Sequence, residues 1–277
     1  MQSSPRLLLR LVLALLGLVS AASAAAAGVD TSTASPPQTS ADATPGRGPG
    51  LGADIAAYYT APIHWTGEEW ALFAGVLAGT GIAYHYDGDV RTHFVGPAVT
   101  TGGSTHDVED AIPTLAFVVG TWGYAVLLDN DAGRSEAWQM VEAGGLSGVT
   151  SYALQFAFSR EAPDVTNNPH EWFKGGLGTF PSAHVTVAFA VGTVFAESGG
   201  DDFRWLRRFL GYGLGVGTAY ARLHHNQHWL SDVVAGGALG ASTGVFVLAR
   251  HEQRQVHANW QVVPLPGGAM LTYNRVF

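Results

Sequence analysis

Two short stretches of this 277-residue sequence combine residue types that could act together on an anion. The first, residues 180–184, reads Phe-Pro-Ser-Ala-His and is expected to begin a helix with Pro181 at the first helical position, where its missing N–H costs nothing. The hydroxyl of Ser182 and the backbone N–H groups of that turn, including that of Ala183, favour a phosphate-like oxyanion, because the positive end of the helix dipole attracts negative charge. His184 lies in the same turn, where it could donate a proton to the anion.

The second stretch, residues 221–232, supplies a cation, an imidazole and a carboxylate. His228 and Asp232 are four residues apart and would share one face of a helix. Asp232 is therefore expected to hold one ring nitrogen of His228 and to leave the other nitrogen available as a nucleophile. The planar guanidinium of Arg222 suits phosphate oxygens.

Other interpretations exist for the same residues. A His–Asp pair at helix spacing can be purely structural, and an arginine near a helix end can simply bind carbonyl groups. The spacing of His224 and His228 also permits a zinc site, but this is a weak signal by itself, and the chain has no cysteine to complete it. The phosphotransfer pattern explains the His–Asp pair better, so no metal site is expected.

Together the two stretches resemble the signature of the type 2 phosphatidic acid phosphatase and vanadium haloperoxidase superfamily. The second motif of that family is Pro-Ser-Gly-His, and the third is Ser-Arg, five residues, His, three residues and Asp. Arg222, His228 and Asp232 match the third motif, with Ala221 in place of the serine, and the second motif matches except that Ala183 replaces the glycine. The resemblance extends over roughly residues 66–250.

The resemblance implies an all-α fold, a six-helix bundle, and a metal-independent phosphatase without a cofactor. His228 would be the nucleophile, oriented by Asp232, and His184 would protonate the leaving alkoxide. Water would then hydrolyse the phosphohistidine intermediate. The phosphate would be bound by residues of both motifs: Arg222, Ser182 and Ala183.

The first family motif, which is Lys, six residues and Arg-Pro, is altered in this sequence. When the motif is aligned on Pro163, Gln155 stands in the place of the lysine and Ala162 in the place of the arginine. Arg160 is the only cation left in this segment, and we expect it to serve as a substitute phosphate ligand.

These observations define one leading function and two alternatives. The leading hypothesis is an exported phosphatase acting on a lipid phosphate, an isoprenoid diphosphate or a small phosphomonoester. The altered first motif favours, as the main alternative, a non-catalytic envelope protein that retains the fold. A vanadate-dependent haloperoxidase is less favoured, because that cofactor also relies on several cations and the chain is short for that branch.

Composition excludes some partners. The formal net charge is −8 with only 14 lysine and arginine residues, so a nucleic-acid partner is not expected. The absence of cysteine excludes disulfides and thiolate metal sites. The sequence does not indicate an oligomeric state.

The N-terminal segment, residues 1–24, has the pattern of a secretory signal peptide. Arg6 and Arg10 precede a short apolar core at 11–19, and a small-residue cleavage site follows at 22–24. This predicts export to the periplasm or cell envelope. An uncleaved membrane anchor is the alternative, although the apolar core is short for a span.

The remaining chain divides into a disordered linker at 25–57, a helical domain at 58–250 and a tail at 251–277 with a small β-hairpin. Loops are expected at 85–108 and 161–179. Helices are expected at about 66–84, 110–128, 134–159, 181–197, 202–222 and 229–250.

The apolar segments give a mixed indication of membrane contact. Residues 111–128 and 233–249 are apolar enough to span a bilayer, but most others are shorter or interrupted, and the mean hydropathy of +0.14 is low. The sequence therefore favours a soluble or peripherally attached protein over an integral one. Large aromatic side chains are expected to fill the core or helix interfaces: Trp70, Trp122, Trp138, Trp205 and Phe209.

Overall fold

The computed structural model describes residues 51–95, 107–127, 131–199, 203–258, 260–265 and 268–273. The predicted signal peptide at 1–24 and most of the predicted linker at 25–57 lie outside these ranges.

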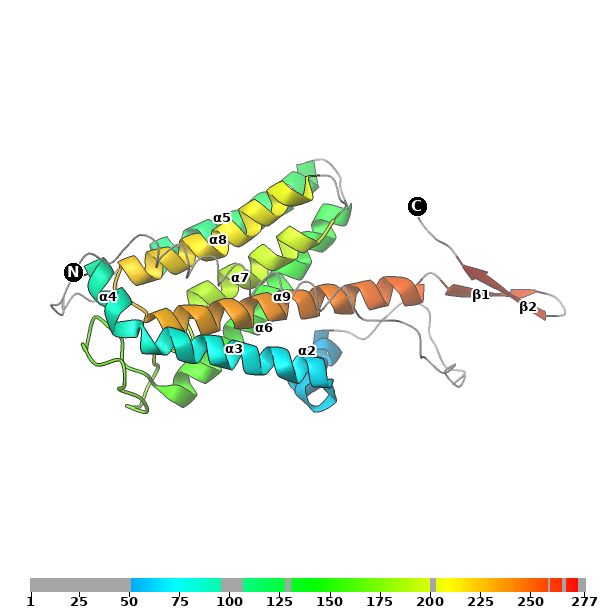
Figure 1. Ribbon diagram of the computed structural model, residues 1–277. Helices are drawn as coiled ribbons and strands as arrows, with labels where there is room; N and C mark the ends of the chain where they lie inside the picture. The colour runs from blue at the N-terminus through cyan, green and yellow to red at the C-terminus, as the bar shows by residue number, and fades with distance from the viewer. Residues whose placement is uncertain are drawn as a thin grey trace.

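Six long helices form the body of the molecule, and each lies within a few residues of a predicted position, apart from a longer C-terminal end of the last (Figure 1). They are α3 (Gly67–His85), α5 (Asp107–Leu127), α6 (Asp131–Phe158), α7 (Ala183–Glu197), α8 (Arg204–His224) and α9 (Leu230–Ala258). The central helix is α7, which packs against α5, α6, α8 and α9, while α3 lies along α9. The all-α class expected from the sequence is confirmed.

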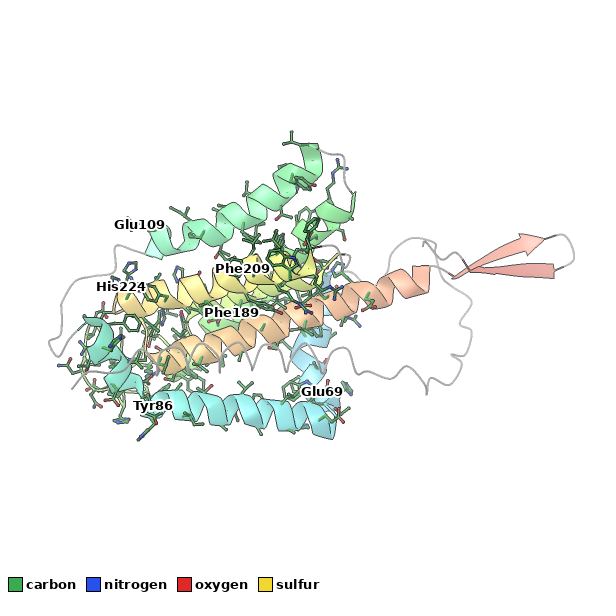
Figure 2. The ribbon with its side chains drawn as sticks, turned by 45° about the horizontal axis from the view of Figure 1, so that its top comes forward. Glu69, Tyr86, Glu109, Phe189, Phe209 and His224 are labelled. Carbon is green, nitrogen blue, oxygen red and sulfur yellow. The ribbon has the colours of Figure 1, made fainter. Side chains whose placement is uncertain are left out.

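The central position of α7 follows from its composition, because its side chains are apolar or small on every face. Val191 and Val194 pack with Met140 of α6 and Val247 of α9, and all four are almost completely buried. Phe189, labelled in the interior of the bundle in Figure 2, is 1% exposed. The helix that carries the second motif is therefore held from all sides.

Glycines allow the helices around α7 to approach closely. A Cβ atom at Gly240 of α9 would lie 2.1 Å from the carbonyl oxygen of Thr186 on α7. Gly192 of α7 faces Gly211 of α8 in the same way, with 2.1 Å between a Cβ built at Gly192 and the Gly211 carbonyl oxygen. Backbone contact of this kind needs a residue without a side chain on at least one of the two helices.

Two helices lie where the sequence predicts none. Helix α2 (Leu51–Thr60), followed by the 3₁₀ turn η1 (Ala61–His64), begins inside the expected linker. Long-range contacts explain its order: the buried Asp54 pairs with Arg250 at 3.2 Å, and the Tyr58 hydroxyl lies 2.8 Å from the hydroxyl of Thr243. These partners are almost two hundred residues away, so local composition did not reveal them.

Helix α4 (Asp87–Val95) lies in the segment that was expected to be a loop. Its sequence has little apolar periodicity, but Asp87, Val90 and Arg91 are buried. Val90 packs with Leu230 and Val234 at the start of α9, which fixes α4 against the rest of the bundle.

The C-terminal part also differs in extent. Helix α9 continues to Ala258 rather than ending near Arg250. Strands β1 (Trp260–Leu265) and β2 (Gly268–Tyr273) follow and pair antiparallel, with Trp260 opposite Tyr273.

The outer surface of the bundle is strongly apolar. The aromatic residues expected in the core are instead exposed: Trp70 by 49%, Trp122 by 51%, Trp138 by 66%, Trp205 by 71% and Phe209 by 72%. The expectation was wrong because α7 already fills the interior, so these faces of α3, α5, α6 and α8 point outward. Stretches without any charged residue run along the same four helices: 70–84, 111–127, 143–158 and 209–221.

One described helical segment, Leu230–Glu252, is long and apolar enough to cross a membrane, and 56% of its apolar window is buried within the protein. Because the core helix of a soluble protein has the same features, the segment alone fits both environments.

The close crossing of α7 and α9 predicts a specific loss of stability. Gly240→Ala is expected to destabilise the protein by roughly 1–3 kcal/mol, because the new methyl group collides with backbone rather than with a movable side chain. Gly213→Ala is the matched control, since nothing lies within 4 Å of a Cβ at that exposed position of α8. Thermal unfolding followed by circular dichroism measures both variants, and equal Tm values would contradict the packing described here.

Candidate active site

The residues of all three motifs gather at one end of the bundle, where α9 begins (Figure 1). The end of α3, α4, the loop after α6, the start of α7 and the end of α8 meet there. Figure 2 shows Tyr86 and His224 at this end and Glu69, at the start of α3, at the other. Sequence segments far apart in the chain are therefore brought together by the antiparallel course of the helices.

The third-motif residues form a buried group. Arg222, in the last turn of α8, places Nη2 3.3 Å from Nε2 of His228. The other ring nitrogen, Nδ1, lies 3.5 Å from Oδ2 of Asp232, within ion-pair range and longer than an ordinary hydrogen bond. The structure thus places the carboxylate on one side of the imidazole and the guanidinium on the other. The pairing of His228 with Asp232 was expected, but His228 lies in the turn before α9 and not on a shared helix face.

Asp232 is held by the helix that carries it. Its Oδ2 accepts the backbone N–H of Trp229 at 3.0 Å, which is half of a capping box at the start of α9. The backbone N–H of Ser182 donates to the carbonyl oxygen of Asp232 at 3.0 Å. This main-chain bond joins the second motif directly to the third.

The second motif differs from prediction in one detail. Helix α7 begins at Ala183 with Ser182 as its N-cap, so Pro181 precedes the helix rather than occupying its first position. The Ser182 hydroxyl makes no capping bond and is completely buried without a hydrogen-bond partner in the described part of the chain. His184 is partly exposed in the first turn.

A buried polar atom without a partner carries a cost of about 1–3 kcal/mol, so its presence needs an explanation. Within the described residues, the amide group of Gln227 and Oδ1 of Asn226 share this state with the Ser182 hydroxyl. Gln227 and Asn226 immediately precede His228 in the sequence. A polar or anionic ligand that accepts from the Ser182 hydroxyl would remove that part of the cost.

The altered first motif supports the loop before α7. The side chain of Gln155 is buried and donates from Nε2 to the carbonyl oxygen of Pro181 at 2.7 Å. The Ser151 hydroxyl donates to the same oxygen at 3.2 Å. Gln155, which stands in the place of the family lysine, thus holds the backbone that leads into the second motif.

Arg160 does not have the position expected of a phosphate ligand. Its side chain is completely buried, and each of its guanidinium nitrogens donates to protein oxygen atoms. Nη1 contacts Asp232 Oδ1 at 2.5 Å, and Nη2 contacts Asp87 Oδ2 at 2.6 Å. The prediction treated Arg160 as the surviving cation of its segment and missed that two buried carboxylates compete for it.

Asp87 and Ser231 are parts of the site that the sequence did not identify. Asp87 accepts the backbone N–H of Ser231 at 2.8 Å and its hydroxyl at 2.7 Å. Burial raises the pKa of the Asp87 carboxyl, and the nearby Arg160 guanidinium opposes this shift. No motif pointed to Asp87, because it lies among Gly and Asp residues typical of a loop.

Aromatic rings enclose the Arg160 guanidinium. Its Cζ atom lies 4.5 Å from the ring centre of Trp172 and 5.3 Å from those of Tyr84 and Trp229. A cation over aromatic faces gains further attraction when it is shielded from water.

The described residues contain no group of three or more metal-ligating side chains.

The comparisons with known proteins point to the family that the motifs resemble. The family model of the PAP2 superfamily matches residues 136–255, which include all three motifs. The lipid A 1-phosphatase of Porphyromonas gingivalis is 28% identical over 170 residues, and this match covers 53% of the chain but only 36% of that relative. The resemblance that the motifs indicated is thereby confirmed.

A structural relative is the first transmembrane PAP2 type phosphatidylglycerolphosphate phosphatase from Bacillus subtilis. Its crystal structure aligns with 65% of this chain and 96% of its own chain, at a TM-score of 0.42 and 15% sequence identity.

The buried Ser182 hydroxyl predicts the binding of a phosphate analogue. Orthovanadate is expected to bind, and Ser182→Ala is expected to weaken this binding roughly tenfold or more, because one hydrogen bond to a charged group is lost. Isothermal titration calorimetry measures the effect, with Ser242→Ala on the exposed face of α9 as control. The assignment fails if both variants bind vanadate as tightly as the unmodified protein.

Proposed function

Because residues 136–255 match the family model of the PAP2 superfamily, we propose that the protein is a metal-independent phosphatase in which His228 is the nucleophile. The observation that carries the proposal is the group around His228. It combines a ring nitrogen beside Arg222, a carboxylate behind the other nitrogen, and an unpartnered buried hydroxyl at Ser182. These are the parts that a phosphoryl group needs: a nucleophile, a cation and hydrogen-bond donors.

The proposed reaction has two displacements. His228 Nε2 attacks phosphorus, the new N–P bond forms as the P–O bond of the ester breaks, and His184 gives its proton to the leaving alkoxide. A water molecule then attacks the phosphohistidine and gives its proton to His184, while the N–P bond breaks. The products are an alcohol and inorganic phosphate, and both histidines return to their starting states.

The negative charge of the phosphoryl group is balanced with fewer cations than the family pattern provides. Arg222 is one contributor, and the N-terminus of α7 with the Ser182 hydroxyl is the other. Arg160 is committed to Asp87 and Asp232. We therefore propose a working site with reduced electrostatic stabilisation, which favours slow turnover over loss of activity.

We propose a phosphorylated lipid as the substrate class. The relatives named above act on a lipid A phosphate and on phosphatidylglycerolphosphate, as their names state. The exposed apolar faces of α3, α5, α6 and α8 would contact acyl chains and keep the protein at a bilayer, where such a substrate resides. The proposed contact with acyl chains differs from the soluble or peripherally attached protein that the sequence favoured. Export directed by residues 1–24 remains part of the proposal.

The non-catalytic alternative rests on the first motif. Gln155 and Arg160 both serve structural contacts, so neither of them supplies charge to an anion. A protein that only binds an anionic lipid headgroup at this site would show the same geometry. Turnover distinguishes the two functions.

Phosphate release provides that test. The unmodified protein is expected to release phosphate from phosphatidic acid or an isoprenyl diphosphate with EDTA present, and His228→Ala is expected to lower kcat by roughly a thousandfold or more. His224→Ala is the matched control, because His224 is exposed near the same loop and should leave kcat unchanged. No release by folded, unmodified protein from any of these substrates would support the non-catalytic alternative instead.

Membrane contact has a separate test. Because the outer helix faces are apolar, the protein is expected to stay in the membrane pellet after extraction with alkaline carbonate and to need detergent for release. Immunoblotting of pellet and supernatant measures the distribution. Recovery of most of the protein in the carbonate supernatant would show that these faces do not lie in lipid.

A further inference from the structure

A continuous buried bridge runs from α4 to the catalytic histidine. Asp87 on α4 contacts Arg160 at 2.6 Å, Arg160 contacts Asp232 at 2.5 Å, and Asp232 lies 3.5 Å from His228. The side chains of Asp87, Arg160 and Asp232 are completely buried. Asp87 lies outside the segment that matches the family model.

The bridge also completes the N-terminus of α9. The first turn of a helix has backbone N–H groups without helical partners, and carboxylates are favoured there. Asp87 accepts the N–H of Ser231, and Asp232 accepts the N–H of Trp229. The two carboxylates thus fix the turn that follows His228, one from outside the helix and one from within it.

The charges of the bridge limit how Asp232 can act. Two buried carboxylates share one guanidinium, because Arg160 gives Nη1 to Asp232 and Nη2 to Asp87. The Ser231 hydroxyl joins them further: it accepts from Arg160 Nη1 at 2.8 Å and donates to Asp87 Oδ2 at 2.7 Å. Arg160 therefore holds Oδ1 of Asp232, which leaves Oδ2 directed at the Trp229 N–H and the imidazole.

We propose that Asp87 and Arg160 are positioning residues for the nucleophile. Asp87 fixes Arg160, Arg160 fixes the rotation of the Asp232 carboxylate, and Asp232 sets the orientation of His228. The proposal rests on the proposed function of His228 and extends it to α4, a helix to which neither the motifs nor the family model assign a role. Neither Asp87 nor Arg160 contacts the phosphoryl group.

The charged groups that face His228 in the described contacts are Arg222 from α8 and Asp232 from α9, with Arg160 and Asp87 behind Asp232. Asp87→Asn removes one of the two carboxylates that hold the Arg160 guanidinium. Arg160 then fixes the Asp232 carboxylate less firmly, and the imidazole of His228 loses part of the support for its orientation.

The first experiment compares Asp87→Asn with Asp89→Asn, which removes the same charge from an exposed position of the same helix. Asp87→Asn is expected to lower kcat roughly tenfold or more with KM changed less than about twofold, because substrate binding groups are untouched. In NMR spectra of ¹⁵N-histidine-labelled protein, the ring ¹⁵N signals of His228 should shift, because the imidazole changes its orientation against Asp232. Asp89→Asn should match the unmodified protein in all three values.

The outcomes distinguish a failure of the positioning role from a failure of the proposed function. If the unmodified protein lacks phosphatase activity, the proposed function fails, while the NMR shift still tests the bridge. If Asp87→Asn folds and leaves both kcat and the His228 ring signals unchanged, the positioning role is overturned.

A second variant covers the case in which Asp87→Asn does not fold. Ser231→Ala removes only the hydroxyl that joins Arg160 to Asp87 and retains every charge. It is expected to lower kcat severalfold at unchanged KM. A kcat equal to that of the unmodified protein overturns the proposal.

Discussion

The contact of one buried guanidinium with two buried carboxylates determines the form of this site. Each of the three side chains would be expensive to bury alone, and removing any one of them leaves an uncompensated charge in the interior. Arg160 therefore needs both Asp87 and Asp232 as partners. This requirement brings together the three segments that carry them: the loop after α6, helix α4 and the start of α9. His228 lies just before α9, and its contacts with Arg222 and Asp232 depend on this packing.

This use of Arg160 explains how the altered first motif fits the rest of the structure. Gln155, in the place of a family lysine, supports the Pro181 carbonyl, and Arg160 supports Asp232. Both act on the backbone and side chains that present the second and third motifs. The segment lies beside the site with its polar groups directed at protein atoms, so the proposed function relies on Arg222 and the start of α7 for charge toward an anion.

The sequence predicted the features that depend on local spacing. The interval of His228 and Asp232 indicated that the two side chains would lie together, although His228 lies in the turn before α9 and not on a helix face. The apolar runs predicted the six long helices, and most of the predicted helix ends lie within a few residues of the observed ones. Tertiary partners determined the rest. Helix α4 has no apolar period and is ordered through Asp87 and Val90, while α2 is ordered through Asp54. The role of Arg160 was missed because no local pattern shows which distant carboxylate will share a buried cation.

The exposure of the aromatic residues is likewise determined by tertiary packing and not by the local sequence. A sequence shows that Trp138 or Phe209 is apolar, but not whether the interior has room for it. In this bundle α7 supplies the interior with small and branched side chains, so the large rings of the surrounding helices face outward. An apolar exterior and a polar cluster at one end suit a protein that meets a charged headgroup at the boundary of a lipid layer.

A crystal structure of the protein with bound orthovanadate would test the arrangement of the site most directly. Vanadium bonded to Nε2 of His228, with Arg222 on the vanadate oxygens and Arg160 still between Asp87 and Asp232, is the predicted result. Vanadate bound elsewhere, or Arg160 released from the carboxylates to contact the vanadate, would contradict the roles assigned to these residues.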